Sequence, residues 1–201
     1  VGVYIKERKD AHKLVEDFML LANRKVAEYV SKKGKGKQKY TFVYRVHDSP
    51  KPDSLASFAQ FAARFGYRIN TKSDKETAKS LNFLMEDVEG KKEQSVLTQL
   101  AIRSMAKAIY TTKNTSHYGL AFDHYTHFTS PIRRYPDVMV HRLLFHYLNG
   151  GQSANEAYYE KLCQHCSQME KKAADAERAS VKYKQAEFLK DQIGSVYTGI
   201  I

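Results

Sequence analysis

The chain contains 201 residues, with 33 lysines and arginines against 22 aspartates and glutamates, so its formal net charge is +11. No stretch reaches the run of about 20 apolar residues that a membrane-spanning helix requires, and the first residues lack the apolar core of a signal peptide. Two cysteines in the whole sequence argue against a disulfide framework and favour a reducing, cytoplasmic location. The positive surplus favours a polyanionic partner, and nucleic acid is the commonest of these.

The first part of the chain is predicted to combine a helix and a strand. Residues 10–29 carry apolar side chains at spacings of three and four, and the aspartate at their start is suited to cap a helix. Glu16 and Asp17 adjoin this apolar run, so one of them is expected either to point into a cleft or to lie on a solvated face. Residues 32–39 form a basic loop, either a solvated tip or a segment that steers a polyanion. Residues 40–46, rich in aromatic and β-branched side chains, predict a strand.

The middle of the chain is predicted to be mostly helical. Amphipathic patterns indicate helices over three stretches: 55–65, 74–89 and 92–107. Gly66 and Gly90 are suited to end the first two. Residues 67–69 form a short strand at most, and the runs 108–110 and 117–122 predict a β-hairpin.

A candidate anion site lies in the sequence TSPIRRY. Ser130 is suited to the N-cap of a helix and Pro131 to its first position. Arg133 and Arg134 would then occupy the first turn, where the helix dipole disfavours positive charge. A bound phosphate would reverse that penalty by accepting hydrogen bonds from amides, hydroxyls and guanidinium groups. The alternative is an ordinary surface helix start with hydrated arginines.

Two helices are predicted after this site. Pro136 is expected to kink or restart the first of them, with Asp137 as the cap of the restart. The second runs from about residue 154 to residue 192 and carries a narrow apolar seam that is expected to pack along the domain. The spacing of that seam predicts that Cys166 lies in the core and that Cys163 is incidental.

Histidines and cysteines offer weak candidates for a metal site. His124, His127 and His141 lack the usual ligand spacing and a partnering carboxylate, and the pair Cys163 and Cys166 lacks a second pair of ligands. The sequence contains no phosphate-cradling GxxxxGK loop, no nucleophile elbow and no tight aspartate cluster suited to two divalent cations. Unpaired bases could stack on one or two aromatic side chains near the anion site: Tyr118, Phe122, Tyr125, Phe128 and Tyr135.

Long ordered motifs run through nearly the whole chain: DAHKLVEDFMLLAN, YRVHDSP, SHYGLAF, HYGLAFDHYTHFTSPIRRYPDVMVHRLL and AERASVKYKQAEFLKDQIG. Together they resemble the RNase II/RNase R family of 3′→5′ exoribonucleases, and they are closer to its RNase R branch. The resemblance implies an α+β catalytic domain in which a mixed sheet is wrapped by helices around a narrow channel for single-stranded RNA. In that family, magnesium bound by an aspartate cluster activates the water that cleaves the last phosphodiester, and nucleotides are released processively.

The resemblance also implies roles for three residues. Arg133 matches the first arginine of the family's SPIR motif, which holds phosphate near the cleavage site, and is therefore the candidate catalytic residue. Glu16 and Glu177 match glutamates that contact RNA inside the channel. The helix-start and stacking arguments add further RNA-binding candidates: Thr129, Ser130, Arg134 and Tyr135. For Arg134 the alternative is a structural ion pair.

The metal-binding aspartates of the family belong to a motif that this sequence does not contain. The chain is therefore expected to be the helix-dominated, C-terminal part of an RNB-type catalytic domain over residues 1–193, with an OB-type RNA-binding barrel starting at 194–201. Both ends resemble strands cut from a longer protein, and sheet edges left open by such a cut could pair with a second copy. Magnesium ligands are expected outside the chain, the isolated chain is expected to be inactive, and the full-length protein is expected to be monomeric and not bound to a membrane.

Two other functions stay open at this point. One is a family member that has lost catalysis and serves as an RNA-binding or regulatory module, which the upstream aspartates would decide. The other is a protein-interaction domain with an accidentally basic surface. RNA binding that does not depend on salt would favour the latter.

Overall fold

The computed structural model describes residues 9–33 and 39–196, which divide into two compact units. The first unit comprises four described stretches: 9–33, 39–46, 109–117 and 122–196. The second comprises two: 47–108 and 118–121. The expected strand at the N-terminal end, most of the basic loop and most of the expected final strand lie outside the described residues.

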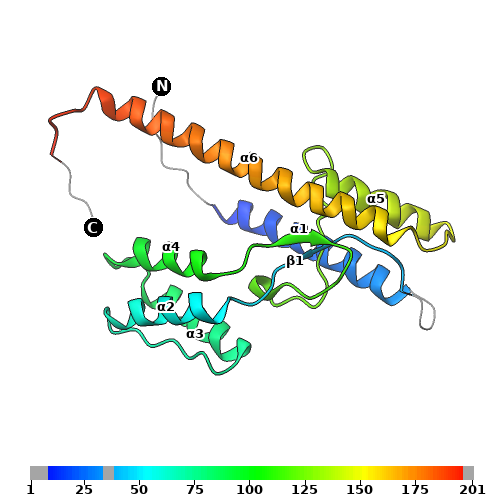
Figure 1. Cartoon of the computed structure of the whole chain (residues 1–201), viewed down its shortest axis with the longest axis horizontal. Helices are drawn as coiled ribbons and strands as arrows, with labels where there is room; N and C mark the ends of the chain where they lie inside the picture. The colour runs from blue at the N-terminus through cyan, green and yellow to red at the C-terminus, as the bar shows by residue number, and fades with distance from the viewer. Residues whose placement is uncertain (1–8, 34–38, 197–201) are drawn as a thin grey trace. The chain divides into compact units, whose positions relative to one another are not determined.

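The first unit combines a small sheet with three helices (Figure 1). Its strands β1 (Tyr44–Val46) and β2 (Ile109–Thr111) pair antiparallel, with Tyr44 opposite Thr111 and Val46 opposite Ile109. Its helices are α1 (Asp10–Lys33), α5 (Tyr135–Leu148) and α6 (Glu156–Lys190). The helix α6 packs against β2 and α5. The expectation of a helix-dominated α+β fold is confirmed.

All of these elements contribute to the core of the first unit, which consists of Ala27, Val30, Phe42, Val43, Tyr44, Val46, Tyr110, Met139, Val140, Leu143, Tyr147 and Cys163. Burying a large apolar side chain of this kind stabilises a fold by about 1.5–3 kcal/mol. A hydrogen bond also joins two segments of this core: the hydroxyl of Tyr147 on α5 donates to the carbonyl oxygen of Thr41 at 2.6 Å.

The long helix α6 is packed only along its first half. Cys163 is fully buried in the core, so the prediction that it is incidental is wrong, whereas Cys166 is partly buried and packs against that core. Residues three apart share one face of a helix, so the apolar seam alone did not show which of the two cysteines lies at its centre. From Met169 onward nearly all of α6 is exposed, and the expectation that its whole seam packs along the domain is also wrong.

The second unit is a cluster of short helices: α2 (Pro52–Ala63), α3 (Asp74–Asp87), α4 (Gln94–Ser104) and the 3₁₀ turn η1 (Tyr118–Leu120). Its core consists of Phe58, Ala62, Leu81, Leu84, Val88, Leu97 and Ala101. The hydroxyl of Ser73 caps α3 by accepting from the amide of Glu76 at 3.3 Å. Gly66 and Gly90 follow α2 and α3 with φ of +86° and +76°, a conformation that favours glycine, as predicted.

The predicted strands differ most from the structure. Only Tyr44–Val46 of the predicted strand 40–46 pairs with another strand, and that partner is β2. The predicted hairpin is wrong, because residues 117–122 form an isolated bridge from His117 to Phe122 around η1. Residues 67–69 are not in a strand. Strands of three residues carry too little alternation to identify their partners.

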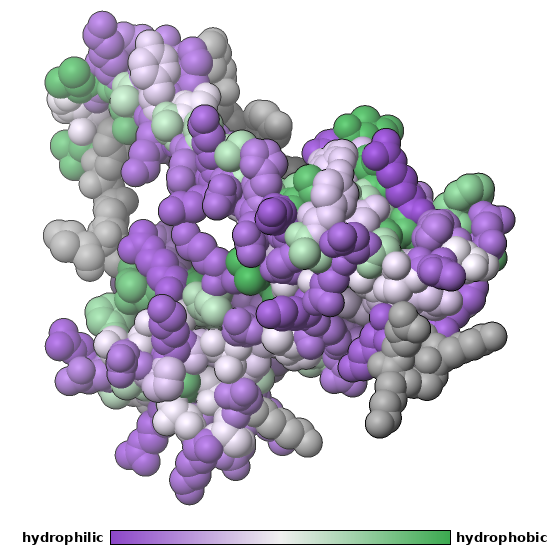
Figure 2. All heavy atoms as spheres, turned by 45° about the vertical axis from the view of Figure 1, so that its right-hand side comes forward, coloured by the Kyte–Doolittle hydropathy of each residue, from purple (hydrophilic) through white to green (hydrophobic). Residues whose placement is uncertain are grey.

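No helix in the described part of the chain is long and apolar enough to cross a membrane. Figure 2 shows that hydrophilic side chains cover most of the visible face, with smaller apolar patches among them. This surface agrees with the large number of charged residues in the sequence.

Candidate active site

Asn23 of α1 anchors the segment that leads to the candidate anion site. Its side chain is nearly fully buried, and its Oδ1 accepts from the backbone amides of Phe128 and Thr129 at 2.9 and 3.2 Å. Its Nδ2 donates to the hydroxyl of Tyr125 at 3.1 Å. Without this side chain two partly buried amides would lose their acceptor, at a cost of up to about 1–3 kcal/mol each. The first helix therefore fixes the backbone that precedes Ser130.

The sequence TSPIRRY forms a single turn and not the start of a helix. The amides of Arg133 and Arg134 donate to the carbonyl oxygen of Ser130 at 3.3 and 3.1 Å. The helix α5 begins at Tyr135, after an extended Arg134 with φ −129° and ψ 115°. The predicted N-cap role of Ser130 is therefore wrong. Pro136 was expected to kink or restart a helix, and the structure shows no kink, because α5 begins beside this proline. Proline has no amide hydrogen and its ring clashes with the carbonyl four residues earlier, so a helix starts beside Pro136 and does not run through it.

A buried carboxylate, that of Asp137, connects this turn to α5. It has no exposed surface, and its Oδ1 accepts from the amide of Ser130 at 2.7 Å and from Nη2 of Arg134 at 2.9 Å. The prediction that Asp137 caps a restarted helix is wrong, since its carboxylate bonds the turn that precedes α5. The alternative of a structural ion pair for Arg134 is confirmed. The spacing of three residues between this arginine and this aspartate was the signal that could have shown the pair.

Three buried polar atoms at this turn have no hydrogen-bond partner among the described residues: Thr129 Oγ1, Arg134 Nε and Asp137 Oδ2. Buried polar groups in folded proteins nearly always have a partner, so each exception requires an explanation. A concentration of such atoms at one turn is more typical of a functional site than of a structural one.

Four of the predicted site residues line one cavity of about 480 Å³ between this turn and α6: Arg133, Arg134, Tyr135 and Glu177. We call it the Arg133 cavity. The side chain of Arg133 is exposed, and its Nη2 donates a long hydrogen bond of 3.4 Å to the hydroxyl of Ser130. The other donors of this guanidinium remain for a ligand. A planar guanidinium of this kind can bind a phosphate through two parallel hydrogen bonds.

Glu16 lies on a second cavity of about 430 Å³, together with Thr129 and Arg134. Glu16 borders this cavity and is also exposed to solvent. Arg134 lines both cavities, whereas Ser130 lines neither and contributes its carbonyl, amide and hydroxyl groups to the turn itself.

One wall of the Arg133 cavity contains a network that the sequence did not predict. Arg45 forms two hydrogen bonds with the carboxylate of Glu170, at 2.6 and 3.0 Å, and its guanidinium lies 4.5 Å from the centre of the Tyr110 ring. The hydroxyl of Tyr110 is 2.8 Å from Nδ1 of His127. Burial, with the positive charges of Arg134 and Arg45 nearby, lowers the pKa of His127 to about 3. His127 is therefore neutral at physiological pH.

No group of three histidine, cysteine, aspartate or glutamate side chains in the described ranges could hold a metal ion. The histidines weighed above have other interactions. His127 is hydrogen-bonded to Tyr110, and Nε2 of His141 is 2.9 Å from the carbonyl oxygen of Phe128, on whose ring the imidazole stacks. His124 is 2.7 Å from the side-chain amide of Asn114.

Comparisons with known proteins identify relatives of this chain. A model of the RNB domain matches residues 1–150. The chain is 41% identical over 201 residues to Ribonuclease R 1 of Lactococcus lactis, covering 98% of this chain and 24% of that protein. It is 38% identical to Ribonuclease R of Aquifex aeolicus, covering 100% of this chain and 28% of that protein.

Among solved structures, the fold is similar to Mycoplasma genitalium RNase R in complex with ribose methylated single-stranded RNA. The TM-score is 0.80 at 28% sequence identity, and the match covers 94% of this chain and 30% of that one. The chain thus spans about a quarter of the length of the curated relatives it matches.

Proposed function

This chain belongs to the RNB-domain family, and on that premise we propose that it is the C-terminal part of the catalytic domain of a 3′→5′ exoribonuclease. The substrate is single-stranded RNA, which the full-length protein degrades processively to nucleotides. Residues 1–193 belong to the catalytic domain, and an OB-type barrel begins at 194–201. The observation that carries this proposal is the exposed guanidinium of Arg133 on the same cavity as Glu177. The curated relatives named ribonuclease R support it.

In this proposal Arg133 is the catalytic residue of the chain. Its guanidinium clamps the scissile phosphate and offsets the negative charge that develops on the phosphate oxygens in the transition state. The ion pair of Arg134 with Asp137 holds the turn that presents Arg133. The turn cannot shift without separating this pair and leaving the buried carboxylate without its partner, which keeps the clamp in one position.

The remaining residues bind the RNA chain. Glu16 and Glu177 carry carboxylates, which accept hydrogen bonds and repel phosphates, so they contact ribose hydroxyls or base amino groups. Tyr135 presents an exposed ring at the mouth of the Arg133 cavity, on which a base can stack. Thr129 and Ser130 supply hydroxyls at the same turn.

Magnesium is the cofactor that the family resemblance implies. The described residues do not form a magnesium site, because no three of their histidine, cysteine, aspartate or glutamate side chains are grouped to hold a metal ion. We therefore place the metal ligands in the longer protein, outside this chain, and expect the chain on its own to be inactive. The full-length protein is expected to be a cytoplasmic monomer.

The experiment uses single-stranded RNA labelled at its 5′ end and the full-length protein. With magnesium we expect the labelled RNA to shorten progressively from its 3′ end, and with a chelator we expect no shortening. Release of internal fragments would contradict the exonucleolytic assignment. Salt-dependent binding without any shortening would instead identify an RNA-binding protein that has lost catalysis. Shortening by the isolated chain would contradict the placement of the metal ligands elsewhere.

A further inference from the structure

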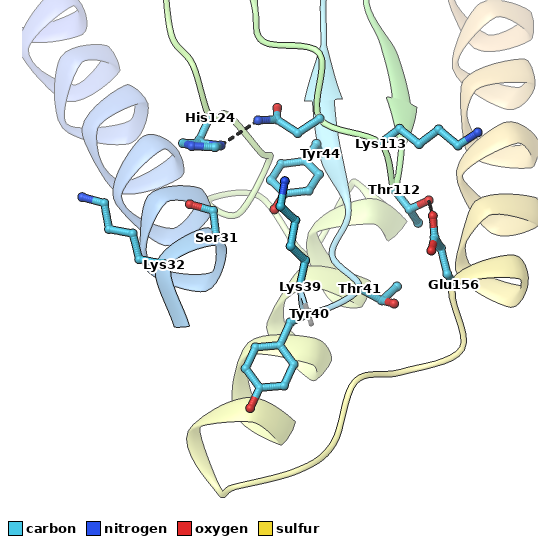
Figure 3. A pocket seen from close by; sticks show the side chains of 11 residues that line it. Ser31, Lys32, Lys39, Tyr40, Thr41, Tyr44, Thr112, Lys113, His124 and Glu156 are labelled. Atoms are coloured by element: carbon cyan, nitrogen blue, oxygen red, sulfur yellow. Dashed lines mark hydrogen bonds between the residues drawn. The ribbon is translucent and has the colours of Figure 1, made fainter. Parts of the chain in front are cut away.

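A separate pocket of about 510 Å³ lies in the first unit (Figure 3), and we call it the basic pocket. It is lined by Ser31, Lys32, Lys39, Tyr40, Thr41, Tyr44, Thr112, Lys113, Asn114, His124 and Glu156. None of these residues lines the Arg133 cavity or the cavity of Glu16. Ser31 lies 15 residues beyond Glu16 on α1, which corresponds to roughly 22 Å along the helix. The volume of the basic pocket lies within the range of small-molecule sites, about 300–1,000 Å³.

Positive charge dominates the lining of the basic pocket. It contains the ammonium groups of Lys32, Lys39 and Lys113 against one carboxylate, that of Glu156. None of the three lysines forms an ion pair with a residue that the structure describes. The nearby carboxylate of Glu160 accepts hydrogen bonds from Thr111 and Thr112 and attracts Lys113. The three ammonium groups still outnumber the two carboxylates, which favours an anionic ligand.

Figure 3 shows how the lysines are arranged. Lys39 extends into the middle of the view toward the ring of Tyr44, whereas Lys32 and Lys113 stand on opposite sides with their ammonium groups turned outward. Lysine carries its charge on a flexible four-carbon stem. Lys39 is therefore placed to contact a ligand without moving. Lys32 and Lys113 can reach the same ligand by rotation of their side chains.

Tyr44 supplies a hydrogen-bond donor to the basic pocket. The residue is only 6% exposed and lines the pocket, but its hydroxyl is not among the buried polar atoms that lack a partner, so the hydroxyl oxygen is open to the pocket. Burial raises the pKa of Tyr44 to about 12, so the hydroxyl keeps its proton and can only approach a ligand as a donor or as a neutral acceptor. The hydroxyl can donate a hydrogen bond to an oxygen of an anionic ligand in the pocket.

We propose that the basic pocket binds the phosphate group of a nucleotide. A phosphate monoester carries close to two negative charges and three strongly accepting oxygens. The negative charges of the phosphate match the ammonium groups of Lys39, Lys32 and Lys113, and one of its oxygens can accept from the hydroxyl of Tyr44. The volume of the pocket leaves room for a ribose or base beside the phosphate. This proposal does not depend on the catalytic assignment, since the two sites share no residue.

Lysine acetylation footprinting of the intact protein, read by mass spectrometry, tests the site without any substitution. AMP should slow the acetylation of Lys39 at least fivefold and leave the exposed Lys79 of the second unit unchanged. Inorganic phosphate should protect Lys39 more weakly, and adenosine should not protect it. RNA oligonucleotides with and without a 5′-phosphate distinguish an RNA end from a free nucleotide as the source of the phosphate. Equal protection by adenosine and AMP, or no protection of Lys39 by any of these probes, would overturn the proposal.

Substitutions give a second measurement, by equilibrium dialysis with labelled AMP in the presence of a chelator. Lys39→Gln should weaken AMP binding about tenfold, and Tyr44→Phe, which keeps the buried ring, should weaken it about threefold. Lys79→Gln removes the same charge from the second unit and should change the affinity less than twofold. If Lys39→Gln and Lys79→Gln behave alike, the attraction comes from the net charge of the protein and the pocket is not the site.

Discussion

The Arg133 cavity and the basic pocket are both cationic, but they hold their positive charges in opposite ways. In the Arg133 cavity, the guanidinium of Arg134 is fixed by a carboxylate with no exposed surface, and Arg133 stands on the turn that this pair secures. In the basic pocket no ammonium group has an ionic partner among the described residues, and two of the three point outward in Figure 3.

This difference means that the Arg133 cavity can position a phosphate, whereas the lysines of the basic pocket can only attract one. A guanidinium on a fixed turn can hold one phosphate in one geometry, which the transition state of a phosphodiester cleavage requires. Lysines on flexible stems can attract an anion but cannot set its orientation. The comparison therefore predicts that changes near Arg133 affect stability and turnover steeply, and that charges without buried partners can be removed at little cost to the fold.

The largest expected effect follows from removing the buried carboxylate. Asp137→Ala should lower the free energy of unfolding by about 3–5 kcal/mol, because it leaves the Arg134 charge buried without its partner and the Ser130 amide without its acceptor. Urea denaturation measures this change. Asp137→Asn should cost less, since one oxygen can still accept from that amide.

Asp175→Ala is the matched control for this prediction. It removes the aspartate of an exposed ion pair with Arg178 in the second half of α6. Exposed pairs of this kind contribute at most about 1 kcal/mol. If the two alanine variants lose similar stability, the distinction between fixed and unfixed charges does not hold.

The next effect concerns turnover in the full-length enzyme. Arg133→Ala should lower the rate constant for RNA cleavage by roughly 100-fold, about 2.7 kcal/mol of transition-state stabilisation. RNA binding should change little, because other parts of the longer protein contribute to it. Arg133→Lys should also be defective, since a point charge cannot replace a bidentate fork. Single-turnover kinetics separate these effects, and unchanged turnover in either variant would remove Arg133 from the reaction.

The sequence predicted the helices well because their signals are local. Apolar spacing and terminating glycines act within one or two turns, as at Gly66 and Gly90. The pairing of β1 with β2 was not predicted, because it joins three-residue strands that are distant in the sequence. The same limit explains why the run 117–122 was assigned to a hairpin with the wrong partner.

The candidate site was predicted in part. The family resemblance identified Arg133 and Glu177, and the stacking argument added Tyr135. The structure places all three on one cavity, although no local pattern relates Arg133 to Glu177. The predicted helix start at Ser130 was wrong, because a helix that began there would have to run through Pro136, and α5 instead begins at Tyr135. Asn23, Asp137 and the contacts of Arg45 depend on tertiary packing, which composition and periodicity do not reveal.

The smallest of the three effects concerns the buried wall of the Arg133 cavity. Burial, with Arg134 and Arg45 nearby, lowers the pKa of His127 to about 3 in the folded protein. An unfolded histidine titrates near a pKa of roughly 6.5. The folded state therefore binds fewer protons below that pH, so the stability that the neutral ring contributes is complete above pH 6.5 and decreases as the pH falls toward 3.

At pH 5 this difference should lower the free energy of unfolding by about 2 kcal/mol relative to pH 7.5. His127→Gln keeps a polar group beside Tyr110 but does not titrate, so its loss between the two pH values should be smaller than that of the wild type by this amount. His165→Gln removes an exposed histidine from α6 and should leave the wild-type pH dependence intact. If the two variants share one pH dependence, His127 is not held neutral, and water reaches the wall of the Arg133 cavity.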